Sequence, residues 1–167
     1  ERIGAPHTPT LIPDNFEQRA EVLGLCAIVL GEDGIVWNMR ILSDGALAQK
    51  YGYSEDASAA APRKIAEVLT LIDSRLSAQA KNGSPYLVGS TVTAADVYWA
   101  TMSMCVLVPA PEIMPLTQQN KGMLKYFAMN GQIPVIAEAL TERIKEHQRH
   151  ILGTYCETPA VLGGDYL

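Results

Sequence analysis

Hydrophobic residues recur at helical spacing along most of this 167-residue chain. The clearest stripe consists of five aliphatic residues: Ile65, Val68, Leu69, Ile72 and Leu76. Charged residues lie off that stripe, as in a helix that packs one face against a core. The run Asn82-Gly83-Ser84-Pro85 ends it, with Gly83 suited to the left-handed position after a helix. Alternating apolar and polar runs between hairpin turns, which mark strands, are missing. The pattern predicts an all-α protein.

An earlier helix is predicted to begin at Asp14 as its N-cap. Its apolar residues at helical spacing are Phe16, Ala20, Leu23, Ala27 and Leu30. Gly31 and Gly34 interrupt or kink this helix, because glycine is unfavourable inside helices. A helical pattern resumes at Ile35 and ends in a predicted loop at residues 51–58.

The segment from Thr93 to about Val108 is nearly apolar all round. A helix without a polar face is buried on all sides, so we expect a buried central helix near residues 93–108. Thr93 and Asp96 are spaced as a capping box, in which each side chain accepts a hydrogen bond from the backbone N–H of the other residue. Asp96 is the only charged residue of the segment, and we expect it to act at this cap.

The remaining pattern completes a helical bundle. Three prolines form a predicted rigid linker: Pro109, Pro111 and Pro115. Helices are predicted at residues 115–129 and 134–155, with Pro134 in the first helical position. A buried helix ringed by amphipathic helices is a bundle. The predicted organisation is an extended lead-in or interdomain linker at residues 1–13, a helical domain at 14–156 and an irregular tail at 157–167.

Charge and composition exclude several other classes. The net charge is −5 and no Lys/Arg cluster stands out, so nucleic-acid binding has no electrostatic support. Apolar runs such as Cys26–Leu30 are too short to span a bilayer, and no apolar signal segment opens the chain. The three cysteines have no CxxC spacing, which excludes a zinc finger and argues against a disulfide framework. We expect no membrane partner and a reducing, cytoplasmic location.

The string Tyr86–Tyr98, YLVGSTVTAADVY, resembles the core of the helical C-terminal domain of glutathione transferases. In that domain a tyrosine–leucine–hydrophobic–glycine run leads into a capped, buried helix. Four more segments are similar to parts of bacterial glutathione transferase-like proteins: residues 1–4, 11–20, 31–37 and 147–159. The thioredoxin-like N-terminal domain that binds glutathione in that family matches nothing in this chain.

The resemblance implies a function for the chain as one half of an active site. A glutathione transferase-like protein would use glutathione as co-substrate, and its helical domain would form the side that binds a small apolar electrophile. The implied partners are a thioredoxin-like N-terminal domain and a second copy in a homodimer. We expect no activity from this chain alone, because the residue that activates the glutathione thiol lies in the other half.

Four residues are the candidates for binding the electrophile: Trp37, Met39, Arg40 and Met102. An aromatic ring, a thioether and a guanidinium on one helix are able to line a pocket, with the arginine holding an anion. Met102 adds adaptable apolar surface, as other methionines of the chain do. In the alternative interpretation, Trp37 packs in the core and Arg40 lies along it. No residue of the chain is a candidate for catalysis.

Two acidic or histidine-rich stretches are interpreted as structural. The turn Gly31-Glu32-Asp33-Gly34 and the pair His147 and His150 each lack enough ligands for a metal site, so we expect no metal. Two other functions remain open. One is a non-catalytic protein-interaction module of the same fold, and the other is a stand-alone helical binder of small apolar ligands.

Overall fold

The computed structural model describes residues 10–160, and every regular element in that range is a helix, as predicted. In chain order the elements are α1 Phe16–Leu30, α2 Ile35–Arg40, α3 Ala46–Lys50, α4 Glu55–Lys81, α5 Ala94–Met102, the 3-10 helix η1 Ser103–Cys105, α6 Lys121–Gly131, α7 Pro134–Ala139 and α8 Glu142–Tyr155.

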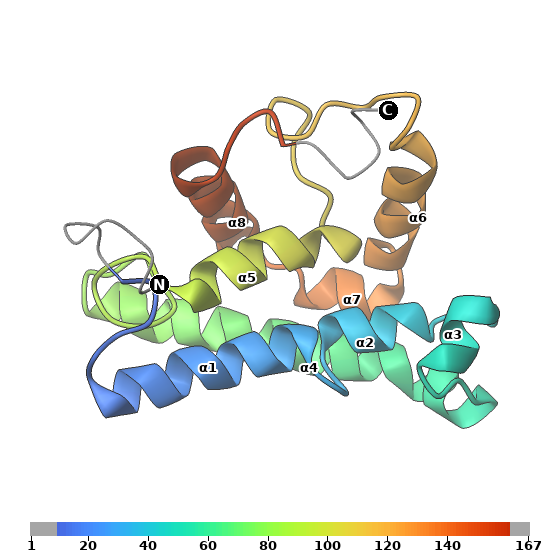
Figure 1. The fold of residues 1–167 in the computed structure, drawn as a ribbon, viewed down its shortest axis with the longest axis horizontal. Coiled ribbons are helices and arrows are strands. Elements are labelled where there is room, and N and C mark those ends of the chain that lie inside the picture. The colour runs from blue at the N-terminus through green and yellow to red at the C-terminus, as the bar shows by residue number, and fades with distance from the viewer. Residues whose placement is uncertain (1–9, 161–167) are drawn as a thin grey trace.

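Figure 1 shows α1 and α2 lying nearly end to end, with the long helix α4 behind them. Helix α5 packs on α1 and α8, while α4 also contacts α2, α7 and α8. The core between these helices includes Trp99 of α5, Leu69 of α4 and Val22 of α1, all completely buried. One hydrophobic core therefore joins the first helix of the chain to the last.

The central helix lies where the sequence predicted it, but it is shorter and open on one side. Helix α5 ends at Met102 and continues as η1 to Cys105. Trp99 and Ala100 are fully buried, whereas Tyr98 is 41% exposed and Met102 is only partly buried. The apolar composition of α5 therefore serves two faces, one in the core and one at the surface.

Helix α1 shows the larger departure from the prediction. All five residues of its predicted apolar stripe are exposed, and Phe16 is 86% exposed. The residues that enter the core are Val22, Leu25 and Val29. Both sets recur at helical spacing, because α1 is apolar on two sides. Spacing alone did not decide which side faces the core.

The start of α1 also corrects the prediction. Its N-cap is Asn15, not Asp14, and the Asn15 Oδ1 atom accepts hydrogen bonds from the N–H groups of Glu17 and Gln18 at 3.1 and 3.0 Å. Both residue types favour this position, so neighbouring candidates are hard to separate from sequence.

Helix α4 begins inside the predicted loop. Its N-cap Ser54 accepts a hydrogen bond from the Ala57 N–H at 3.1 Å, and the helix starts at Glu55. It ends as predicted, with Gly83 beyond the C-cap at φ +75°.

The helix predicted at residues 134–155 is divided in two. Pro134 opens α7 as expected, but the backbone leaves helical geometry at Leu140, where ψ is 73°. Thr141 then caps α8 by accepting from the Ile144 N–H. Its hydroxyl also donates to Asp73 of α4, and Arg143 donates to both oxygens of the same carboxylate at 2.9 and 2.8 Å. The break is held against α4 by Asp73.

Helix α6 begins at Lys121, later than the predicted start near Pro115. The Asn120 side chain accepts from the Thr117 N–H at 2.8 Å and donates to the Pro115 carbonyl at 2.9 Å. These bonds hold residues 115–120 in a turn instead of a first helical turn.

The segment Phe16–Arg40 is long and apolar enough to cross a membrane by length and composition. In the fold, 33% of its apolar 18-residue window is buried, and its two helices contribute Val22, Val29 and Ile35 to the hydrophobic core.

Parts of the predicted lead-in and tail lie outside the described residues, namely 1–9 and 161–167. The described part of the lead-in is anchored by a hydrogen bond from the Ala94 N–H to the Leu11 carbonyl at 2.7 Å. The limits of the helical domain, 14–156, stay a prediction.

Candidate functional site

Asp96 occupies the start of α5 and joins three parts of the chain. The predicted capping box between Thr93 and Asp96 is present. The fully buried carboxylate accepts from the N–H and the hydroxyl of Thr93, each at 2.8 Å, and from the Leu87 N–H, also at 2.8 Å. A fourth contact comes from His147 Nε2 at 3.0 Å. These contacts are those of a structural anchor, because a buried carboxylate is stable only when donors surround it.

His147 reaches Asp96 from α8 and is itself 5% exposed. Its Nδ1 atom has no hydrogen-bond partner among the described residues. His150 lies one turn further on, where its ring packs near those of Tyr86 and Tyr155. Both histidines line one hollow, but of the two it is His147 that contacts Asp96.

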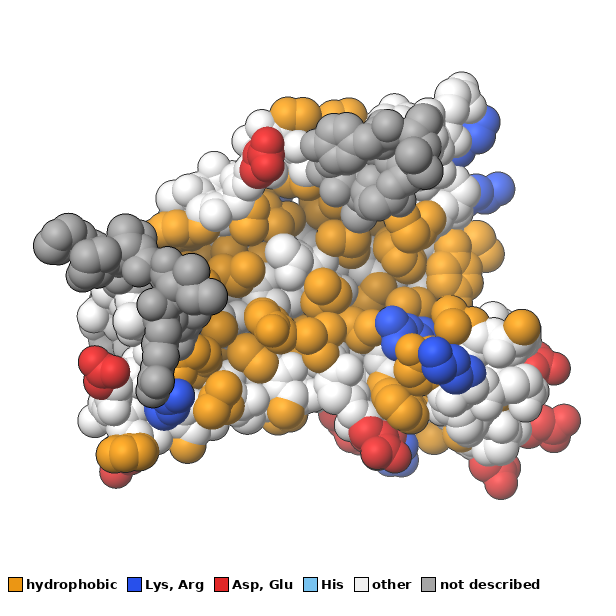
Figure 2. Space-filling model, viewed as in Figure 1, with side chains coloured by type: hydrophobic (Ala, Val, Ile, Leu, Met, Phe, Trp, Pro, Cys, Tyr) orange, Lys and Arg blue, Asp and Glu red, His pale blue; other side chains and the backbone are white. Residues whose placement is uncertain are grey.

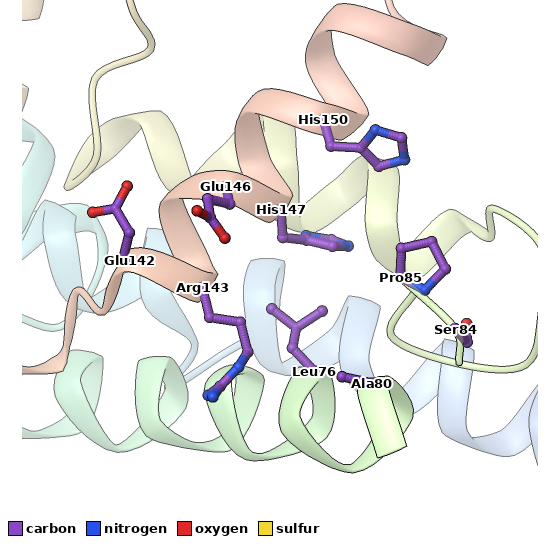
Figure 3. A pocket seen from close by; sticks show the side chains of 9 residues that line it. All are labelled: Leu76, Ala80, Ser84, Pro85, Glu142, Arg143, Glu146, His147 and His150. Atoms are coloured by element: carbon purple, nitrogen blue, oxygen red, sulfur yellow. The ribbon is translucent and has the colours of Figure 1, made fainter. Parts of the chain in front are cut away.

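A hollow of about 540 Å³ lies beside His147, between α8 and the end of α4 (Figure 3). Leu76 and Ala80 of α4 form one wall, and Pro85 closes one end. Its charged lining is already engaged in part, because Arg143 is bound to Asp73 and His147 to Asp96. We call it the His150 hollow, and its polar groups serve mainly the fold.

A second hollow, of about 430 Å³, brings together two of the predicted substrate-binding residues. Met39 and Arg40 of α2 line it together with four apolar side chains from α3 and α6: Leu47, Met123, Tyr126 and Phe127. The Tyr126 hydroxyl bonds to the Met39 carbonyl at 3.4 Å and so ties α6 to α2. This Arg40 hollow is apolar with a few polar groups, which is the usual character of a small-molecule site.

Arg40 is held in place by an aromatic ring. Its guanidinium carbon lies 4.3 Å from the centre of the Tyr51 ring, and the Trp37 ring meets the same tyrosine edge-on at 4.9 Å. No carboxylate among the described residues forms an ion pair with Arg40 within 4 Å. The cation therefore keeps its capacity to bind an anionic group.

The other two predicted residues lie outside this hollow. Trp37 contacts the Tyr51 ring on which Arg40 lies, and Met102 lies on α5 and packs against the core. Sequence reasoning did not single out Tyr126 and Phe127. They come from α6, and no motif in the sequence indicates that α6 packs beside α2.

Apolar side chains gather across the face shown in Figure 2, over α1 and α5 and towards α6. Exposed apolar residues of these helices include Leu23 at 49%, Tyr98 at 41% and Met129 at 57%. Apolar side chains gathered on one exposed face are typical of a surface that contacts another domain or subunit.

None of the three cysteines carries an activated thiol. Burial raises the pKa of Cys105 to about 12, and burial also raises the pKa values of Cys26 and Cys156. A thiol of raised pKa is mostly protonated near neutral pH and is a poor nucleophile.

The chain was compared with protein families, curated proteins and solved structures. No curated protein and no solved structure matches it. The family model described as "Glutathione S-transferase, C-terminal domain" matches residues 45–149, well over half of the chain. The match includes α3 to α7, the Asp96 anchor and most of α8. This chain belongs to the family of glutathione S-transferase C-terminal domains.

Proposed function

We propose that the chain forms the electrophile-binding side of a glutathione-dependent active site, with the Arg40 hollow as the place where the electrophile binds. The observation that carries the proposal is the meeting of Met39, Arg40, Met123 and Phe127 in one apolar hollow with one unpaired cation. Family membership supports it, since glutathione is the co-substrate that the family suggests.

The residues of this hollow suit an apolar electrophile better than glutathione itself. Glutathione carries two carboxylates and an ammonium group, whereas the hollow offers one guanidinium and one carboxylate, Asp44, among apolar side chains. The cysteines supply no activated thiol either. In the proposed reaction the glutathione thiolate attacks a carbon of the electrophile, so that a C–S bond forms and the bond to the leaving group breaks, releasing halide in the case of an aryl halide. A thioredoxin-like half supplies the glutathione site. In this chain, Arg40 would hold an anionic substituent of the electrophile while apolar side chains enclose its body.

We further propose that the thioredoxin-like half covers apolar surface of α1 and α5, and that the parent protein is a homodimer. The exposure of Leu23 and Tyr98 supports this arrangement. The same exposed face also favours the second function, a non-catalytic interaction module, so activity has to separate the two.

The test compares the product of the complete gene with the 167-residue chain in a glutathione-conjugation assay. The complete product should conjugate glutathione to an aryl halide, and the chain alone should show no saturable activity. Saturable conjugation by the chain alone would contradict an active site that needs both this chain and the thioredoxin-like half. A complete product without conjugation activity towards several electrophile classes would favour the interaction module.

Arg40→Gln in the complete product then tests the hollow. Exposed charge pairs contribute about 0.2–1 kcal/mol, so the KM for an electrophile with a carboxylate should rise about 1.4-fold to fivefold. The KM for glutathione and for the uncharged analogue should not change. Lys81→Gln, at the exposed end of α4, is the matched control. If the KM for glutathione rose instead, Arg40 would bind glutathione and not the electrophile, which would contradict the proposal.

A further inference from the structure

A third hollow, of about 640 Å³, lies on α6 away from the Arg40 hollow. Loop 108–116 and the first turns of α6 form it, and its wall is largely apolar, with Met114, Leu116 and Leu124 among its residues. In helical projection, residues 121, 122, 124 and 125 lie on the opposite face of α6 from residues 123, 126 and 127, which line the Arg40 hollow. The proposed function therefore makes no use of this site.

Two lysines stand at the edge of this hollow. Lys121 and Lys125 are exposed and lie one helical turn apart, so their side chains share one face of α6. Lys121 bonds to the neutral Gln118 side chain, which leaves its charge uncompensated. Neither lysine pairs with a carboxylate among the described residues. We call this site the Lys125 hollow.

Among residues 10–160, the charged side chains on the wall of the Lys125 hollow are all positive. No acidic residue of that range lines it, and the positive end of the α6 dipole, which begins at Lys121, lies at the same edge. The His150 hollow, by contrast, has both carboxylates and cations. An occupant of the Lys125 hollow therefore needs a negative group at the lysines and an apolar body against Met114, Leu116 and Leu124.

We propose that the Lys125 hollow binds an amphipathic monocarboxylate, such as a medium-chain fatty acid. Its carboxylate lies between Lys121 and Lys125, and its alkyl chain lies against the apolar wall. The volume of the hollow is within the 300–1,000 Å³ that is usual for small-molecule sites. A small inorganic anion would leave the apolar wall uncovered, and a neutral hydrocarbon would make no use of the two cations.

Gly122 offers a way to fill the hollow without disturbing the fold. It lines the site, and a Cβ atom added there meets nothing within 4 Å. Gly122→Leu should therefore occupy the space that the alkyl chain needs. Gly153→Leu is the matched control, because a Cβ at Gly153 in α8 is also unobstructed and lies outside the three hollows.

The experiment titrates octanoate and 1-octanol into the folded 167-residue chain and follows backbone amide signals by NMR. Octanoate should shift signals of residues 108–125 and bind more tightly than 1-octanol. Gly122→Leu should weaken both ligands at least about tenfold, and Gly153→Leu should not. Replacing both lysines by glutamine should weaken octanoate about twofold to thirtyfold and leave 1-octanol unchanged, because two exposed ion pairs are lost.

Three results would overturn the proposal. The first is no saturable octanoate binding up to about 20 mM, a concentration on the order of 10⁴ times the Kd of a micromolar site. The second is octanoate binding that Gly122→Leu leaves intact. The third is binding that Arg40→Gln weakens and the lysine replacement does not, which would place the ligand in the Arg40 hollow.

Discussion

Asp96 and Arg40 are both charged residues of interhelical contacts, but their surroundings differ in every respect. Asp96 is fully buried and accepts from Thr93, Leu87 and His147. Arg40 is half-buried and rests on one ring, that of Tyr51. A group with all its hydrogen bonds made inside the protein cannot change partners without disrupting the fold. A cation with an open side can, which makes Arg40 the better candidate for function.

The strongest test of this comparison is Asp96→Ala. The change leaves the N–H groups of Thr93 and Leu87 and the ring of His147 without their acceptor. Breaking a buried charged network costs about 3–5 kcal/mol, so the free energy of unfolding measured in urea should fall by that amount. Asp56→Ala, at the exposed first turn of α4, is the control and should cost less than about 1 kcal/mol. If the two variants lost equal unfolding free energy, Asp96 would not be a structural anchor.

The next largest effect concerns the link between α8 and this anchor. His147→Ala removes one donor from Asp96 and opens space in the core, so we expect a loss of about 1–3 kcal/mol in unfolding free energy. In the double variant with Asp96→Ala, the losses should be less than additive, because both changes break the same contact. Strict additivity in the double-mutant cycle would mean that the two residues do not interact in solution.

A third prediction concerns the turn that positions Arg40. A Cβ at Gly34 would lie 2.3 Å from the Ile28 carbonyl oxygen, and Gly34 is the N-cap of α2. Gly34→Ala should therefore cost about 1–3 kcal/mol of unfolding free energy, as overpacking does. Gly153→Ala, where the Cβ is free, should stabilise α8 by up to about 1 kcal/mol. Equal unfolding free energies for the two variants would contradict the close approach of Gly34 to the Ile28 carbonyl oxygen between α1 and α2.

The anchor was accessible from the sequence because it is local. Thr93 and Asp96 are three residues apart, and their capping chemistry follows from that spacing. The contact between His147 and Asp96 could not be predicted from the sequence, because the two residues are 51 positions apart. Likewise, Met39 and Arg40 could be proposed as ligand-lining residues from one short helix. Their partners Tyr126 and Phe127 depend on how α6 packs, which no local pattern encodes.

Helix α1 shows a second limit of sequence reasoning. Its periodicity correctly predicted a helix, but the predicted stripe lies at the surface and Val22, Leu25 and Val29 lie in the core. In a helix that is apolar on two sides, helical spacing fits both the buried and the exposed set of residues. The breaks at Leu140 and before Lys121 were missed for another reason: side-chain hydrogen bonds of Thr141 and Asn120 set them.

The most direct test of the central claim is to fill the Arg40 hollow and measure both substrate KM values in the complete gene product. Gly45 lines this hollow, its φ of 170° suits any residue, and a Cβ there meets nothing within 4 Å. Gly45→Leu should raise the electrophile KM at least about fivefold, roughly 1 kcal/mol, and leave the glutathione KM unchanged. Gly122→Leu, on the other side of α6, should change neither. An unchanged electrophile KM in Gly45→Leu would contradict the account.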